Sequence, residues 1–210
     1  GRRIYSNIRH AMSYLVAVHI PLAGLGLLPV LFGWPLLFYP LHVLFLEFVI
    51  DPACAFVFEA DSESSDIMKR KPRPPAERLF TATLLRRSVT LGLVALLLCV
   101  AVYGLALRTM SEHEARALAF VAIVVSNLAL IFISRSRSES FATVFIKPNR
   151  VYWLIVALAM AALFIAIGVP LAADAFRFAT PPLGALSIAI MATVSLLLAC
   201  GLVLRRSARP

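Results

Sequence analysis

The chain is poor in acidic residues and cysteines, and it has no polar stretch long enough to form a soluble catalytic domain. Asp and Glu number 11 against 20 Lys and Arg. All three cysteines fall in apolar runs, and no Cys-x-x-Cys or Cys/His spacing is present. This argues against a disulfide framework and against a zinc site. The longest polar stretch, residues 59–84, is too short to fold alone. We therefore expect no separate soluble enzyme domain and no cysteine-based site.

What the chain has in abundance is apolar sequence. Hydrophobic residues make up 61% of it and its mean hydropathy is +0.90, whereas soluble domains contain roughly 45–50% apolar residues. Pro21 and Pro29 in the first apolar window and Pro52 in the second predict that these two helices are interrupted. Residues 1–14 are expected to run straight into the first helix. The sequence predicts an all-α membrane protein, a bundle of six transmembrane helices near residues 11–32, 41–58, 85–107, 115–133, 151–171 and 183–204.

The basic residues divide unequally between the two sides of this predicted bundle. With the amino terminus in the cytoplasm, all but three of the 20 Lys and Arg lie on the cytoplasmic side, the exceptions being Arg108, Arg116 and Arg177. Because cytoplasmic loops carry an excess of Lys and Arg, this bias predicts that both termini are cytoplasmic. We interpret the net charge of +9 as topology signals and lipid-headgroup contacts in a multi-pass protein of a bacterial plasma membrane. We expect no nucleic-acid partner.

Two acidic residues lie four positions apart inside the second apolar window. Glu47 and Asp51 share one face of a helix, and Pro52 follows directly. A carboxylate in the hydrocarbon core costs roughly 2.5–3.5 kcal/mol on insertion scales, so such residues are rarely kept without a function. Pro52 removes the backbone hydrogen bond to the carbonyl of Phe48, and transporters build cation sites from broken helices. The pattern predicts a cation or proton site. The alternative is a structural role in packing or pairing, although we expect no Lys or Arg within a span to pair with these acids.

Histidine and amide side chains also lie within the apolar windows. His19, two residues before Pro21, either hydrogen-bonds a backbone carbonyl that the proline frees, tunes the acids or ligates a metal. Asn127, beside Ser126, either holds helices together through hydrogen bonds or supplies an amide oxygen to a hard cation. His42 lies near the outer end of its window and is expected at the membrane interface.

Three segments, in order along the chain, resemble P-type cation-transporting ATPases. Residues 1–9 (GRRIYSNIR) resemble the segment that enters their fifth transmembrane helix, and residues 46–53 (LEFVIDPA) resemble their ion-binding sixth helix. Residues 66–80 (DIMKRKPRPPAERLF) resemble the loop that follows. The resemblance is to the calcium-pump-like branch and covers the whole chain as the fifth to tenth helices. It implies that residues 1–210 form a carboxy-terminal transmembrane domain, and a start at Gly1 without Met suggests a piece of a longer protein.

The matched register carries the family's ion ligands onto this sequence. Asp51 stands at the central ion-binding aspartate, Glu47 where calcium pumps usually carry Asn, and His19 where their fifth helix carries a ligating Asn. Asn127 aligns with an acidic ligand of the eighth helix, whereas Leu22 replaces a Glu ligand. The resemblance thus implies a metal site made of Glu47, Asp51, Asn127 and His19. It favours one bound ion over two and calcium as the transported cation, with manganese, magnesium or a proton as alternatives.

The resemblance also implies which activities need other domains. In this family ATP phosphorylates an aspartate in a cytoplasmic Asp-Lys-Thr-Gly-Thr motif, and no such motif occurs here. We therefore expect no catalytic residue and no ATP hydrolysis by this chain alone, with ATP and Mg²⁺ acting through other domains. The implied partners are the lipid bilayer and the phosphorylation, nucleotide-binding and actuator domains and first four helices, contacted through residues 1–14 and 60–84. The alternative is a free-standing six-helix ion channel, ion-coupled carrier or accessory membrane subunit.

Overall fold

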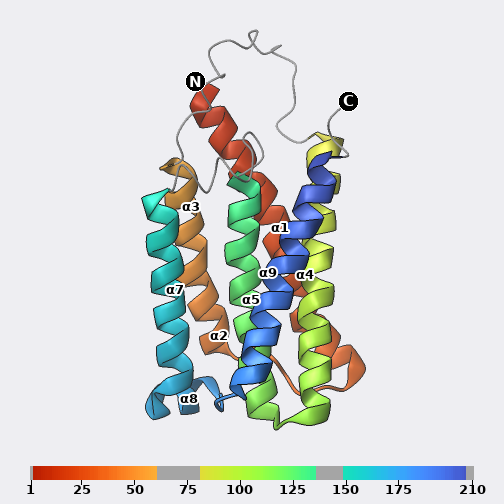
Figure 1. Ribbon diagram of the computed structural model, residues 1–210, viewed down its shortest axis with the longest axis vertical. Helices are drawn as coiled ribbons and strands as arrows, with labels where there is room; N and C mark the ends of the chain where they lie inside the picture. The colour runs from red at the N-terminus through yellow and green to blue at the C-terminus, as the bar shows by residue number, and fades with distance from the viewer. Residues whose placement is uncertain (1, 61–80, 136–148, 207–210) are drawn as a thin grey trace.

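The chain folds into an upright bundle of helices (Figure 1). The computed structural model describes residues 2–60, 81–135 and 149–206, without the side chains of residues 2, 3 and 49–54. Every regular element in these ranges is helical. The elements are α1 (Arg2–Phe32), α2 (Pro40–Phe45), the π-helical turn η1 (Leu46–Ile50), α3 (Asp51–Glu59), α4 (Ala82–Thr109), α5 (Glu112–Arg135), α7 (Arg150–Gly168), α8 (Pro170–Phe176) and α9 (Leu183–Arg206).

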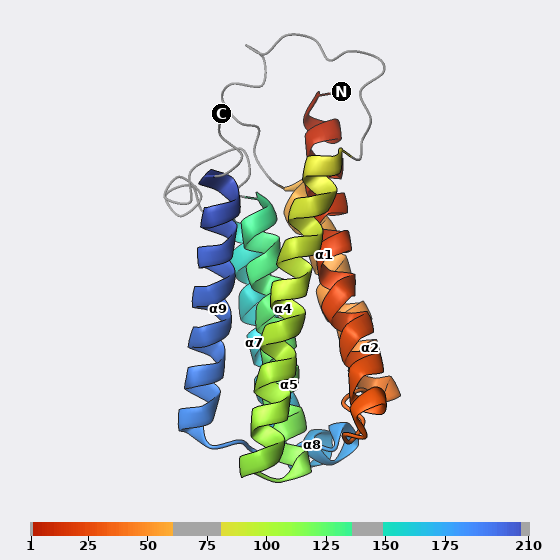
Figure 2. The same cartoon turned by 90° about the vertical axis from the view of Figure 1, so that its right-hand side faces the viewer.

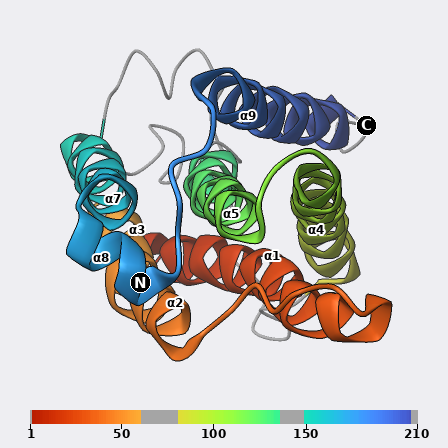
Figure 3. The same ribbon diagram turned by 90° about the horizontal axis from the view of Figure 1, so that it is seen from below.

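Helix α5 is the centre of the bundle, and α1, α4, α7 and α9 pack around it (Figure 3). Its most apolar segment is completely buried, whereas only 22–33% of the corresponding segment is buried in each of the other four long helices. Five buried alanines explain why so many helices can approach α5, because small side chains let helix backbones come close. A polar side chain in the middle of α5 therefore faces protein and not lipid. The alanines are Ala115, Ala117, Ala119, Ala122 and Ala129.

Helices α1 and α4 lie side by side, and the amino-terminal end of α1 extends beyond the rest of the bundle (Figure 2). A Cβ added at Gly92 of α4 would lie 2.6 Å from the carbonyl oxygen of Ala17 in α1. That carbonyl lacks its α-helical donor because residue 21 is proline. One turn earlier, the buried Oγ atoms of Ser13 and Ser88 form a hydrogen bond of 2.6 Å between the same helices. The position of α1 thus depends on small residues that allow close contact.

Five of the predicted spans are helices long and apolar enough to cross a membrane. As expected, the first runs without a break from the amino-terminal residues. The predicted second span differs, because residues 40–59 form three consecutive segments, α2, η1 and α3, instead of one long helix. The predicted fifth span also ends earlier, at Gly168, and Pro170 begins the separate short helix α8.

Proline has different effects in the first two predicted helices. The prediction that proline interrupts the first helix is wrong, because α1 continues as one α-helix through Pro21 and Pro29. Each proline removes one backbone donor, and packing against neighbouring helices can hold such a helix together. The second helix is interrupted as predicted, by the π-helical turn that ends directly before Asp51 and Pro52.

Candidate ion-binding site

The π-helical turn η1 carries the first of the two acidic residues predicted to bind an ion. Glu47 is its second residue and has an exposed side chain in this chain. Asp51 and Pro52 begin α3 immediately afterwards, and Pro52 cannot donate a backbone hydrogen bond to the preceding turn. Single π-helical turns within α-helices are frequent at functional sites. The side chain of Asp51 lies outside the described part of the structure, so its predicted role stays a prediction.

Asn127 lies in the fully buried middle of α5 and is only 1% exposed. Neither its amide nitrogen nor its amide oxygen has a hydrogen-bond partner among the described residues. Burying an unpaired amide costs free energy, and most buried polar groups in proteins are paired. Its neighbour Ser126 is different, since its Oγ lies 3.6 Å from Sγ of buried Cys99. Ser126 therefore links α5 to α4, whereas no described residue pairs with the amide of Asn127.

His19 is exposed on α1, and its Nδ1 lies 2.8 Å from the carbonyl oxygen of Leu15. This contact matches the expectation that the histidine hydrogen-bonds a backbone carbonyl. The carbonyl is not one that a proline deprives of its donor, because Pro21 removes the partner of Ala17 and not of Leu15. Among the described side chains, His19 forms no hydrogen bond with Glu47 or Asn127.

Helix α5 packs against the segments that carry two other predicted site residues. The described side chains of these three residues form no hydrogen bonds with one another. Helix α5 packs against both η1 and α1, so the helix that carries Asn127 lies next to the segments that carry Glu47 and His19. Within the described residues, no cluster of three or more His, Cys, Asp or Glu side chains could hold a metal ion. The side chain of Asp51 is outside these described residues. The described ligand candidates are therefore one buried amide and two exposed side chains.

A second polar cluster, which the sequence analysis missed, lies at the opposite end of α5 from Arg135. Arg116 is fully buried there and donates hydrogen bonds to the carbonyl oxygens of Leu36 at 3.1 Å and Arg177 at 3.0 Å. It also forms an ion pair with Glu112. The guanidinium carbons of Arg116 and Arg177 lie 5.1 and 4.4 Å from the ring centre of Tyr39. These contacts tie the connection after α1, the start of α5 and the end of α8 to one another.

His42 belongs to the same region, in the first turn of α2, and its predicted place at the membrane interface stays a prediction. The side chain is fully buried, and its ring centre lies 5.0–5.4 Å from those of Phe120, Phe176 and Phe178. Its Nδ1 accepts a hydrogen bond of 3.1 Å from the backbone N–H of Tyr39. The ring is buried because α8 packs against α2, which is a contact between segments distant in sequence.

The expectation that no basic residue lies within a span is wrong. Arg116 is the fifth residue of α5, and Arg86 and Arg87 lie in the second turn of α4. The four-residue spacing of Glu112 and Arg116 is the signal that could have revealed the ion pair between them, because residues four apart on a helix are neighbours. None of these arginines forms an ion pair with Glu47 among the described side chains.

A bundle of long apolar helices around a buried polar residue, with a broken helix bearing acids against it, defines a multi-span membrane protein. The chain belongs to the cation-transporting ATPases: residues 35–205 match the family described as "Cation transporting ATPase, C-terminus". The resemblance to P-type cation-transporting ATPases that residues 46–53 and 66–80 indicated is thereby confirmed.

Curated relatives agree with this family. The chain is 31% identical to the "Calcium-transporting ATPase" of Bacillus subtilis over 146 residues, which are 68% of the chain and 16% of that protein. It is 30% identical to "Calcium-transporting ATPase 1" of Bacillus cereus over 185 residues, 80% of the chain and 21% of that protein. It is also 28% identical to "Cation-transporting ATPase pma1" of Synechocystis over 142 residues, 67% of the chain and 16% of that protein. The chain thus spans about a fifth or less of the length of these relatives.

Proposed function

We propose that this chain is the carboxy-terminal half of the membrane domain of an ATP-driven cation pump and provides most of its intramembrane ion site. Glu47, Asp51, Asn127 and His19 are the proposed ligands. The observation that carries the proposal is the π-helical turn η1, which bears Glu47, leads into Asp51 and Pro52, and packs against the helix of the unpaired Asn127 amide.

The chemistry of this arrangement suits a hard cation. Two carboxylates and an amide supply oxygen ligands, and backbone carbonyls near Pro52 can supply more. A bound cation also compensates for the free-energy cost of carboxylates in a membrane and of an unpaired buried amide. Calcium is the favoured ion, because it takes six to eight oxygens and because relatives are named as calcium-transporting ATPases. We keep manganese, magnesium and a proton as alternatives.

The exposure of Glu47 and His19 is part of the proposal. Carboxylates and imidazoles within a membrane are expected to face the bundle interior or an aqueous cavity. We propose that the first four helices of the pump cover the face of α1 and η1 that carries them. Those helices would also supply the ligands needed to complete a calcium shell.

The proposed topology has six spans with both termini cytoplasmic in a bacterial plasma membrane. The segments α2, η1 and α3 together form the second span, since about 20 residues are needed to cross the hydrocarbon core. The cytoplasmic phosphorylation, nucleotide-binding and actuator domains would bind ATP and Mg²⁺ and contact residues 1–14 and 60–84. Of the second stretch, residues 61–80 lie outside the described part of the chain.

The test is ion-dependent phosphorylation of the full-length pump in membranes. Asp51→Asn is expected to abolish calcium-dependent formation of the phosphoenzyme from ATP while leaving the protein inserted and stable. The control is Asp174→Asn, because Asp174 is an exposed acid on α8, outside the proposed site. Calcium dependence like that of the wild type in Asp51→Asn would contradict the assigned site.

A further inference from the structure

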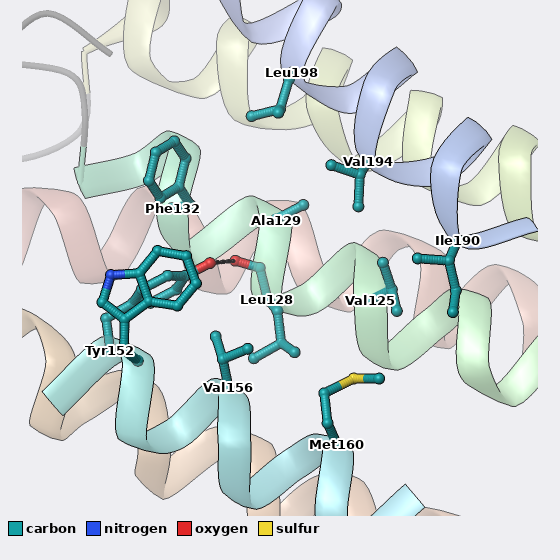
Figure 4. A pocket seen from close by; sticks show the side chains of 11 residues that line it. Val125, Leu128, Ala129, Phe132, Tyr152, Val156, Met160, Ile190, Val194 and Leu198 are labelled. Atoms are coloured by element: carbon teal, nitrogen blue, oxygen red, sulfur yellow. Dashed lines mark hydrogen bonds between the residues drawn. The ribbon is translucent and has the colours of Figure 1, made fainter. Parts of the chain in front are cut away.

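An apolar groove lies between α5, α7 and α9, on the side of α5 away from α1 (Figure 4). Its floor includes Val125 and Ala129 of α5. One wall includes Val156 and Met160 of α7, and the other includes Ile190 and Val194 of α9. Helix α7 packs on α5 and α3, and α9 packs on α5 and α4, so the two wall helices stand apart from each other (Figure 3).

The lining of the groove is almost entirely carbon. The hydroxyl of Tyr152 is already used in a hydrogen bond of 3.3 Å to the carbonyl oxygen of Leu128 (Figure 4). The other polar atom among the lining side chains is the indole nitrogen of Trp153, which is a hydrogen-bond donor. The lining side chains therefore offer no free oxygen ligand to a cation. It fits an apolar occupant that enters from the surrounding bilayer.

The size of the groove favours a slender occupant. Its volume is about 240 Å³, many times the roughly 10–15 Å³ that holds one water molecule. A single hydrocarbon chain is slender enough to enter this space from the side of the bilayer.

Arginines near one end of the groove indicate that the occupant carries an anionic head group. Tyr152 and Phe132 line this end, and the guanidinium carbon of Arg135 lies 5.5 Å from the ring centre of Tyr152. Arg150, the exposed first residue of α7, lies two residues before Tyr152. Arg205 and Arg206 end α9 at the same end of the bundle, where Glu59 is the sole acid among the described residues (Figure 1).

We propose that this groove binds one acyl chain of an anionic phospholipid whose phosphate lies beside Arg135 and Arg150. The lipid would hold α7 and α9 at a fixed separation around α5. The site lies on the side of α5 away from α1. It requires only that the helices lie in a membrane. Failure of the lipid test would therefore leave the proposed ion site untouched, and failure of the ion-site test would leave the lipid site untouched.

The experiment is native mass spectrometry of the full-length protein, purified in mild detergent and supplied with equal amounts of phosphatidylglycerol and phosphatidylcholine. The wild type is expected to retain one phosphatidylglycerol. Val156→Phe, which fills the groove from α7, is expected to reduce this retention at least fivefold. The matched control is Leu158→Phe on the same helix, because Leu158 is 62% exposed and does not line the groove.

Two further variants separate loss of the site from misfolding. Val194→Phe fills the groove from α9 and is expected to have the same effect as Val156→Phe, with both variants keeping the thermal unfolding midpoint of Leu158→Phe. Arg150→Gln is expected to keep a bound lipid while losing the preference for phosphatidylglycerol. Equal lipid retention in Val156→Phe and the wild type would overturn the proposal, as would equal loss in Leu158→Phe. Co-purification of a small membrane protein that Val156→Phe displaces would also overturn it.

Discussion

Gly92 is the position at which a single methyl group should disturb the bundle most selectively. In Gly92→Ala the new Cβ would lie 2.6 Å from the carbonyl oxygen of Ala17, whereas ordinary contacts begin at 3.4 Å. It would also lie 2.8 Å from Cδ1 and 3.0 Å from Cβ of Ile20. The nearest atom is backbone and cannot rotate away, so α1 and α4 must separate by several tenths of an ångström.

The magnitude follows from two opposing effects. Overpacking of this kind typically costs about 1–3 kcal/mol. Replacing glycine by alanine within a helix returns about 1 kcal/mol of helix propensity. The net expectation is a loss of roughly 0–2 kcal/mol for Gly92→Ala and a larger loss for Gly92→Val, whose branched side chain meets the same atoms.

The assay is the thermal unfolding midpoint of the purified protein in detergent. Gly184→Ala serves as the control, because it adds the same methyl group near the start of α9, where no atom lies within 4 Å. We expect the order of stability to be Gly184→Ala, then Gly92→Ala, then Gly92→Val. The close-contact account is refuted if Gly92→Val is as stable as Gly184→Ala.

Three other predictions concern buried polar groups. Arg116→Met leaves the carbonyl oxygens of Leu36 and Arg177 without their donor, so we expect a loss of about 2–4 kcal/mol and a lower unfolding midpoint. Asn127→Leu removes an unpaired buried amide, so stability should stay unchanged or rise by about 1–2 kcal/mol while calcium affinity of the full-length pump falls. Ser13→Ala removes one partner of the Ser13–Ser88 hydrogen bond, and we expect a loss of about 1 kcal/mol in the unfolding measurement.

The outcomes that would contradict these predictions are distinct. An unchanged midpoint in Arg116→Met would mean that the polar cluster around Arg116 does not stabilise the fold. Loss of stability in Asn127→Leu with unchanged calcium affinity would assign the amide a structural role. A Ser13→Ala protein as stable as the wild type would show that the hydroxyl pair contributes no net stability.

The long helices could be predicted from the sequence because their signal is local. A run of about 20 apolar residues is sufficient to indicate a span, and α1, α4, α5, α7 and α9 each contain one. The break at Asp51 and Pro52 is local as well, since proline cannot donate the hydrogen bond that continues a helix. The continuity of α1 through Pro21 could not be predicted in this way, because it depends on neighbouring helices.

The polar cluster around Arg116 and His42 shows that side-chain burial, too, depends on packing between segments distant in sequence. The burial of His42 could not be predicted from the sequence, because it depends on α8 and on Phe178 beyond it, which fold over α2. Asn127 is correctly expected in the middle of a helix, but only the packing of α5 at the centre of the bundle shows that its amide is unpaired. The surroundings of Glu47 depend on segments beyond this chain under the proposed function.

The central claim is that the acids of the broken second span hold the transported cation. Equilibrium binding of radioactive calcium to the purified full-length pump in the absence of ATP tests it most directly. The account predicts one ion bound per wild-type molecule and per Asp174→Asn molecule, and none bound at the same calcium concentration by the double variant Glu47→Gln/Asp51→Asn. Unchanged calcium binding by a folded double variant would contradict it.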